Sequence, residues 1–329
     1  MAQDDHAVVV GIRTYPAIRP LQGPFWDADE FRKWLLDPEK GNVPEDNIKF
    51  LTTDHFDDPD NTDHPNASEI HQLFKDFVIR GYMGGDPIGR RLYIYMAGHG
   101  FSERTDMTAA ALYAAEADPP FAPNIAATAY ARWFHRNATF DEIVLVMDCC
   151  RTTSPTNIIT PPTLPSTMGS SRRAQVRTFF AYAVADGQPS RERQVNGKWR
   201  GIFTSAFLEA LDRAVANEAG AVRGKQLADY IHQIVGRTQV PDIEVNYRHD
   251  VTFSVGRNPG SIPFTVRLDP FADGLKVLIL NHQNEEILEE SPAEPTFTIQ
   301  LTAGLYKVVV NGTDRKALFE VPVETETTI

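Results

Sequence analysis

The 329-residue chain has little cysteine, no long apolar run and fewer basic than acidic residues. Its two cysteines, Cys149 and Cys150, are adjacent and cannot staple a secreted fold, which favours a reducing compartment. No apolar run approaches the ~20 residues that span a bilayer. Residues 1–5 also lack the basic and apolar regions of a signal peptide. We therefore expect a cytoplasmic protein that does not act at a membrane.

The charge balance also limits the partners. With a net charge of −12 and no strong cluster of Lys and Arg, the chain lacks the basic face of a nucleic-acid-binding protein. No spaced set of Cys and His accompanies the cysteine pair, so a zinc site is not expected. The hydrophobic content of 42% is ordinary for a globular protein. We expect no cofactor and no nucleic-acid partner.

Two apolar runs end at the residue types that a cysteine hydrolase needs. Residues 91–97 lead into Gly98-His99-Gly100, and residues 142–147 lead into Asp148-Cys149-Cys150. Both runs are apolar at odd and even positions, which is typical of parallel strands buried on both faces. Because sites lie beyond the carboxyl ends of such strands, His99 and a cysteine 50 or 51 positions later can meet there. The histidine would then activate the thiol as a base.

The sequence does not decide between Cys149 and Cys150. Neighbouring side chains of a strand point to opposite faces, so only one of the two can face His99. Gly100 allows close backbone approach, and its amide and that of Cys150 are candidates for stabilising an oxyanion. Such a donor typically contributes ~3 kcal/mol.

Strands alternate with helices through the first two thirds of the chain. We expect strands at 6–12, 48–51, 91–97, 109–117 and 142–147, and helices at 27–36, from 67 onward and at 126–137, with Asp27 as the N-cap of the first. This order predicts an α/β fold with a mostly parallel sheet flanked by helices. Residues 151–177, rich in Ser, Thr and Pro, are expected to form a flexible linker. A strand at 178–185 and helices at 203–215 and 224–235 follow.

The composition changes near residue 258. Short alternating runs separated by turn residues such as Asp273-Gly274 and Asn311-Gly312 predict a small antiparallel β-sandwich. We therefore expect a domain at 1–257 and a β-sandwich accessory domain at 258–329. The second carries no candidate catalytic cluster, so we expect it to bind a protein partner or to serve as a scaffold.

Residues 6 to about 255 resemble caspase-fold cysteine peptidases of clan CD, and in particular the bacterial metacaspase-like, or orthocaspase, proteins. The matching pieces are the strand at 8–12, Leu21-x-Gly23-x-x-x-Asp27-Ala28, Gly98-His99-Gly100, Asp148-Cys149-Cys150 and Gly201-Ile202-Phe203-Thr204. The resemblance implies that Cys150 is the nucleophile and His99 the base. It also implies that bacterial stress, cell-death or phage-defence pathways are the setting.

The same resemblance implies a specificity for substrates. Metacaspases carry acidic residues at positions matching Asp27 and Asp148 and cleave proteins or peptides after Arg or Lys. The segment with Asp186, Ser190 and Glu192 would form part of the substrate groove. At Pro24, Ala97 and Arg151 this chain carries other residue types than metacaspases commonly do. The family's calcium sites cannot be placed on this sequence, so calcium dependence stays open.

Other interpretations are kept beside this one. Asp27 can be a helix cap and Asp148 a residue that orients a loop. The whole chain can be a caspase-fold adaptor that binds partners without turnover, or a Cys-His hydrolase of non-peptide substrates. If the enzyme cleaves after Arg, the pair Arg172-Arg173 in the linker is a candidate site of self-cleavage.

Overall fold

The computed structural model describes residues 3–55, 63–103, 109–118, 121–153, 158–214, 221–235, 239–246, 250–254, 262–281, 284–301, 304–321 and 326–329. The chain divides into two compact units. The first comprises Met1–Ala214 and Arg223–Ser254, and the second Val215–Val222 and Val255–Ile329. The boundary that we expected after residue 257 falls among residues 255–261, which lie outside the described part of the chain.

A six-stranded sheet is the centre of the first unit, in the order β12-β8-β7-β3-β1-β2. Its strands are β1 (Asp5–Gly11), β2 (Ile48–Thr52), β3 (Gly89–Ala97), β7 (Phe140–Asp148), β8 (Arg177–Tyr182) and β12 (Asp242–Val245). All neighbours are parallel except the edge pair β12–β8. The strand that follows β1 in the chain, β2, lies on one side of it, and the next strand, β3, lies on its other side. The direction in which strands are added to the sheet therefore reverses between β1 and β3. In open α/β sheets, ligands bind at such a reversal.

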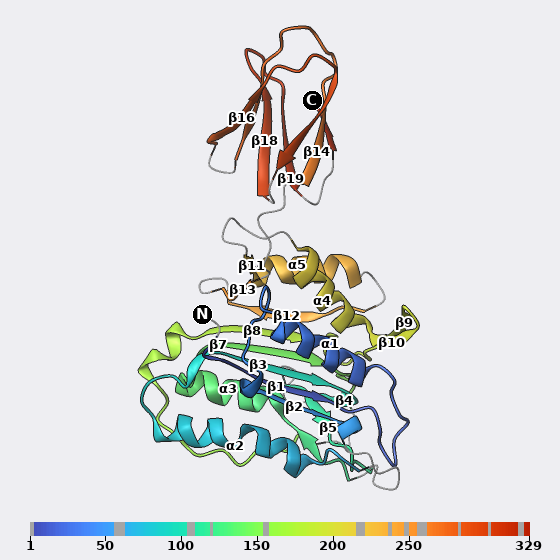
Figure 1. Cartoon of the computed structure of the whole chain (residues 1–329), viewed down its shortest axis with the longest axis vertical. Helices are drawn as coiled ribbons and strands as arrows, with labels where there is room; N and C mark the ends of the chain where they lie inside the picture. Colours follow the sequence, from blue (N-terminus) through green and yellow to red (C-terminus); the bar gives the residue numbers. More distant parts are fainter. Residues whose placement is uncertain are drawn as a thin grey trace. The chain divides into compact units, whose positions relative to one another are not determined.

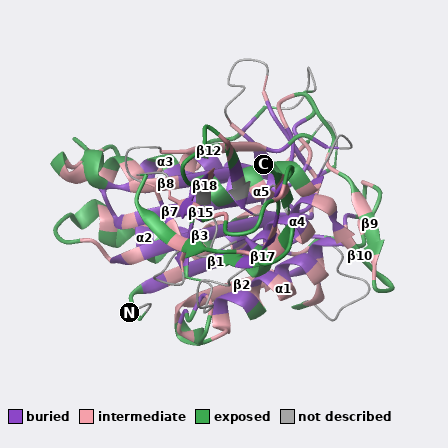
Figure 2. Ribbon diagram, turned by 90° about the horizontal axis from the view of Figure 1, so that it is seen from above, coloured by how far each residue is buried: buried purple, intermediate pink, exposed green. Residues whose placement is uncertain are grey.

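Helices cover both faces of this sheet (Figure 1). On one face lie α2 (Ala67–Met83) and α3 (Ala127–Asn137); on the other lie α1 (Pro24–Leu36), α4 (Ile202–Arg213) and α5 (Gly224–Val235). Even-numbered residues of β1 and β3, with odd-numbered residues of β7, join the core under α2 and α3. The alternate positions pack toward α1 and α4, where Tyr95 stacks on Phe31 at 4.7 Å between ring centroids. Burial on both faces explains the apolar runs at both parities, and Figure 2 shows β1, β3 and β7 buried along most of their length.

The predicted α/β fold with a mostly parallel sheet flanked by helices is confirmed, and two local predictions are wrong. The run at 109–117 forms only a short strand, β5 (Ala111–Tyr113), in a separate sheet with β4 (Gly100–Phe101) and β6 (Asn124–Ile125). The first helix begins at Pro24 with Gly23 as its N-cap, so Asp27 is not the cap. Proline has no N–H to satisfy at a helix start, which favours this earlier position. The carboxyl group of Asp27 is thereby left for other contacts.

Short elements complete the first unit. They are the hairpin β9 (Glu192–Val195) and β10 (Lys198–Gly201), the strand β13 (Thr252–Ser254), and the 3-10 turns η1 (Glu45–Asn47), η2 (Thr53–His55) and η3 (Ser171–Gln175). The strand β11 (Ala221–Arg223) straddles the division between the two units. In the described residues, no helix is both long enough and apolar enough to span a bilayer.

The second unit is a two-sheet β structure with its own core. One sheet has the order β17-β14-β20 and the other β16-β15-β18-β19. The bounds are β14 (Ile262–Arg267), β15 (Val277–Leu280), β16 (Glu286–Glu290), β17 (Thr296–Leu301), β18 (Gly304–Val310), β19 (Lys316–Val321) and β20 (Glu326–Thr328). The pairing is antiparallel except that β20 runs parallel to β14, because the last strand crosses to the other sheet. The acidic edge strand β16 has no alternating apolar pattern, so the sequence does not predict it.

A buried ion network fixes the amino-terminal ends of β3, β7 and β8. The Glu142 side chain, 1% exposed, accepts a hydrogen bond of 2.5 Å from Nε of Arg91 and is paired with Arg90 and Arg177. Arg91 is also fully buried and donates to the Tyr93 hydroxyl at 2.8 Å. Since β3 and β7 lead to His99 and to the cysteine pair, this network fixes the register on which the site depends.

We expect Glu142→Gln to lower the free energy of unfolding by about 3–5 kcal/mol, because it removes the carboxylate that is paired with the buried Arg91. Chemical denaturation measures the change. The control is Glu209→Gln, which breaks an exposed pair with Arg213 at 3.5 Å and should cost less than about 1 kcal/mol. Equal losses in the two variants would contradict a structural role of the network.

Candidate active site

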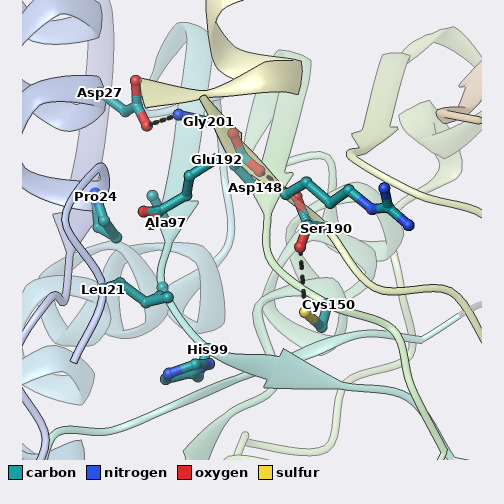
Figure 3. A pocket seen from close by; sticks show the side chains of 12 residues that line it. Leu21, Pro24, Asp27, Ala97, His99, Asp148, Cys150, Ser190, Glu192 and Gly201 are labelled. Carbon is teal, nitrogen blue, oxygen red and sulfur yellow. Dashed lines mark hydrogen bonds between the residues drawn. The ribbon is translucent and has the colours of Figure 1, made fainter. Parts of the chain in front are cut away.

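A pocket with about 470 Å³ of empty space opens at the carboxyl ends of β3 and β7 (Figure 3). It lies beside the point where the strand order reverses. In Figure 3, the side chains of Asp27, Glu192 and Asp148 lie toward one end and His99 and Cys150 toward the other. The lining residues are Leu21, Pro24, Asp27, Ala97, Gly98, His99, Asp148, Cys150, Ser190, Arg191, Glu192 and Gly201. Six candidates from the sequence therefore meet here: Asp27, His99, Asp148, Cys150, Ser190 and Glu192.

Strand alternation separates the two cysteines. Met147 belongs to the core under α2 and α3, and Cys149, two residues later, packs into that same core and is 2% exposed. Cys150 shares the parity of Asp148 and lines the pocket with it. Burial raises the pKa of Cys149 far above its usual range, so this thiol stays protonated. The arrangement therefore leaves Cys150 as the thiol available to a bound substrate.

The loop between β1 and α1 holds His99. The backbone N–H of His99 donates to the Tyr15 hydroxyl at 2.9 Å, and the two rings lie 5.0 Å apart. Nε2 of His99 lies 2.7 Å from the carbonyl oxygen of Arg19, which can only accept, so Nε2 carries a hydrogen. In the neutral ring, Nδ1 is then the free base. Gly98 permits this turn because its φ is +154° and a Cβ there would lie 2.6 Å from the Tyr15 hydroxyl.

The Cys150 thiol contacts the backbone of Ser190. Its Sγ lies 3.8 Å from the carbonyl oxygen of Ser190, to which it donates. Burial raises the pKa of the Cys150 thiol. Among the described residues, no hydrogen bond joins Cys150 to His99. Such bonds often form only when substrate is bound, so this geometry does not disqualify the pair.

Three carboxylates at the other end of the pocket are held by backbone and hydroxyl groups. Asp148 is 7% exposed and accepts hydrogen bonds from the Ser190 hydroxyl at 2.9 Å and from the backbone and hydroxyl of Thr204 at 3.0 and 2.7 Å. Asp27, 2% exposed, accepts from the Gly201 N–H at 2.7 Å. Glu192 accepts from the Gly23 N–H at 2.6 Å.

The two glycines among these contacts allow the carboxylates to converge. A Cβ on Gly201 would stand 2.1 Å from Oδ2 of Asp148 and 3.0 Å from Oδ2 of Asp27. A Cβ on Gly23 would stand 2.7 Å from Oε1 of Glu192 and 3.1 Å from the same Asp27 oxygen. The acidic groups are thus close enough to repel one another. Burial and the neighbouring Asp148 raise the pKa of Asp27 to about 7, and burial raises that of Asp148 as well.

Two further candidates lie outside the set of lining residues. Gly100 follows His99 in β4 and packs on Cys149, where a Cβ would meet the sulfur at 2.6 Å. Asp186 lies behind the cysteine turn, with its carboxylate 2.5 Å from the Ser102 hydroxyl, which is also 2.6 Å from the Arg151 carbonyl oxygen. Asp186 therefore braces the turn that carries Cys150. Arg151 also holds this turn in place, because its guanidinium pairs with Asp242 at 2.6 Å and lies 4.6 Å from the Tyr182 ring centre.

Several residues of the site gave no signal in the sequence. The Arg19 carbonyl is a backbone group and leaves no trace in residue types, and Tyr15 stands in a loop with no regular pattern. Arg200 pairs with Asp27 and directly precedes Gly201, so that motif could have pointed to it. Within the described ranges, no group of three or more His, Cys, Asp and Glu side chains is placed to hold a metal ion.

The chain is similar in structure to several solved proteins. Protein GSU0716 from Geobacter sulfurreducens matches with 10% identity and a TM-score of 0.46, over 78% of this chain and 98% of that one. Caspase-1 from Spodoptera frugiperda matches with 14% identity and a TM-score of 0.46, over 74% and 88% of the two chains. The pro-form of the Spodoptera caspase-1 matches with 14% identity and a TM-score of 0.42, over 74% and 87%. No protein-family model and no curated protein matches the chain.

We expect iodoacetamide to alkylate Cys150 and not Cys149 in the folded protein, because only Cys150 lines the pocket. Mass spectrometry of peptides after labelling at pH 8 measures both sites. Labelling in denaturant is the control and should modify both cysteines. Alkylation of Cys149 at a comparable rate in the folded protein would contradict its burial.

Proposed function

We propose that the protein is a cysteine endopeptidase that cleaves after Arg or Lys. The observation that carries the proposal is one pocket that joins a thiol and an imidazole to three carboxylates. A substrate bound with its basic side chain among Asp27, Asp148 and Glu192 would present its carbonyl group toward Cys150 and His99. Charge-assisted hydrogen bonds from a guanidinium to carboxylates are among the strongest that side chains form.

The proposed reaction uses these side chains and water. Sγ of Cys150 attacks the scissile carbonyl carbon, and the thiol proton passes to Nδ1 of His99. The amides of Gly100 and Cys150 are the proposed donors to the oxyanion. His99 then protonates the leaving amine as the C–N bond breaks. A water molecule, deprotonated by His99, hydrolyses the thioester and restores the thiol.

The setting of this activity is an expectation from the resemblance to caspase-fold peptidases. A bacterial stress, cell-death or phage-defence pathway is proposed on that basis alone. We also propose a protein partner for the second unit, since its sequence suggests no catalytic cluster. Asp186 and Ser190 were both expected in the substrate groove, and the proposal keeps Ser190, which lines the pocket.

Self-cleavage at Arg172 or Arg173 meets a geometric obstacle. Both residues lie in η3, and Arg172 pairs at 2.9 Å with Asp141 near the start of β7. Cys150 follows the end of β7, which at ~3.3 Å per residue lies about 30 Å away. The linker between them runs along α3, where the Trp133 indole donates to the Pro165 carbonyl oxygen at 3.0 Å. Residues 154–157 of this linker lie outside the described part of the chain, and its mobility stays a prediction.

We expect the protein to hydrolyse fluorogenic peptides that end in Arg or Lys and not those that end in Asp, which the carboxylates would repel. Cys150→Ala and His99→Ala should each abolish turnover, whereas Cys149→Ala should keep a substantial fraction because Cys149 lies in the core. If Cys149→Ala were inactive and Cys150→Ala active, the assignment of Cys150 as the nucleophile would be wrong. Rapid alkylation of Cys150 without hydrolysis of any peptide would favour a non-peptide substrate or an adaptor role.

We expect any cleavage at Arg172 or Arg173 to be intermolecular, because one chain cannot bring these residues to its own pocket without leaving α3. Intact-mass measurement would follow Cys150→Ala protein mixed with catalytic amounts of the unchanged protein. The inactive chain should be cut at a rate proportional to the concentration of the active protein. Processing of the active chain with a half-time independent of its concentration would contradict this expectation.

A further inference from the structure

A guanidinium of the chain itself contacts the pocket carboxylate Asp27. Arg200 lies next to the end of β10, and its Nε donates to Oδ1 of Asp27 at 2.5 Å. Its side chain is 14% exposed, so the pair is largely shielded from water. Within the described chain, Arg200 is not one of the residues that line the pocket. The guanidinium therefore neutralises Asp27 without filling the space that a substrate would take.

Asp27 needs such a partner because its surroundings oppose its charge. Burial and Asp148 raise its pKa, and Arg200 and the Gly201 N–H lower it, so that with Arg200 in place the pKa is about 7. The charged and titratable groups around it come from four elements: Asp148 at the end of β7, Glu192 of β9, Arg200 of β10 and Tyr95 of β3. Lys198 of β10 is turned to the Trp26 ring, 3.9 Å from its centre. Arg200 is thus the cation that contacts Asp27 directly.

We propose, building on the proposed peptidase, that Arg200 is a positioning residue whose guanidinium is the fixed counter-ion of Asp27 and favours the ionised form of that carboxylate, which receives a basic substrate side chain. Without Arg200, the ionised form loses its partner and Asp27 is mostly protonated at neutral pH. It then offers a neutral carboxyl group to the substrate, and the pocket loses one of its negative charges. Raising the pH removes the proton and restores the charge.

The test compares Arg200→Gln with the unchanged protein on a peptide ending in Arg and on its neutral analogue ending in citrulline, from pH 6.5 to pH 9. At pH 6.5–7 we expect KM for the Arg peptide to rise about ten-fold or more, in the range of a lost charged contact, with kcat changed much less. The penalty should shrink toward pH 9. Comparing the two proteins at each pH removes every pH dependence that they share.

Two further variants separate charge from structure. Arg193→Gln removes the same charge from the opposite position of the same hairpin, where the side chain is exposed, and should leave KM unchanged. Arg200→Lys keeps a cation beside Asp27 and should recover most of the affinity for the Arg peptide. Thermal unfolding of each variant shows whether the fold is intact.

A direct titration makes the result independent of turnover. In protein with ¹³C-labelled Asp carboxyl groups on the Cys150→Ala background, the Asp27 signal, assigned with Asp27→Asn, should titrate at higher pH when Arg200 is replaced by Gln. Equal midpoints would overturn the inference, as would a loss of activity that is the same for both peptides at every pH. If the unchanged protein cleaves no Arg or Lys peptide, the proposed function fails, and the titration still decides the role of Arg200.

Discussion

The buried carboxylate of Asp148 ties together the segments that form the site. Its oxygens accept hydrogen bonds from Thr204 at the start of α4 and from Ser190 on the loop after β8. Its backbone carbonyl accepts from Gly98, next to His99, at 3.2 Å. A buried charge without partners costs several kcal/mol, so these three segments are held where they satisfy Asp148. The neighbouring Cys150 is thereby fixed relative to the loop that carries His99.

The pocket combines this support with unfavourable electrostatics. Asp27, Glu192 and Asp148 approach one another in a small, partly buried space, where like charges repel: Asp148 raises the pKa of Asp27, and Glu192 raises that of Asp148. The backbone N–H groups of Gly23 and Gly201 and the guanidinium of Arg200 stabilise these carboxylates in part. The buried carboxylates Asp27 and Asp148, with their raised pKa values, contribute little to stability. Such perturbation is typical of functional sites, and a cationic ligand would relieve it.

The fold could be predicted from the sequence further than the site could. Apolar runs such as 91–97 and 142–147 predicted buried parallel strands, and the sheet edge that brings His99 and the cysteines together followed from them. Because these strands are apolar on both faces, alternation alone could not show which face lies under α2 and α3, and so could not choose between Cys149 and Cys150. The prediction of a long strand at 109–117 was wrong because the apolar residues of this run pack in a small separate sheet. Contacts between distant segments, such as Arg200 with Asp27, leave no local pattern to read.

One loop, residues 12–23, connects the two ends of the pocket. Tyr15 and the Arg19 carbonyl hold His99, while the N–H of Gly23 binds Glu192. A hydrogen bond of 2.8 Å from the Leu21 N–H to the Arg13 carbonyl oxygen joins the two ends of the loop and restrains its backbone. In the proposed reaction, the carbonyl of Arg19 would set which nitrogen of His99 acts as the base, and the raised pKa of the Cys150 thiol means that a proton would have to be moved before attack. The loop that holds His99 also contacts Glu192 at the other end of the pocket, so in the proposed peptidase reactivity and recognition would depend on the same backbone.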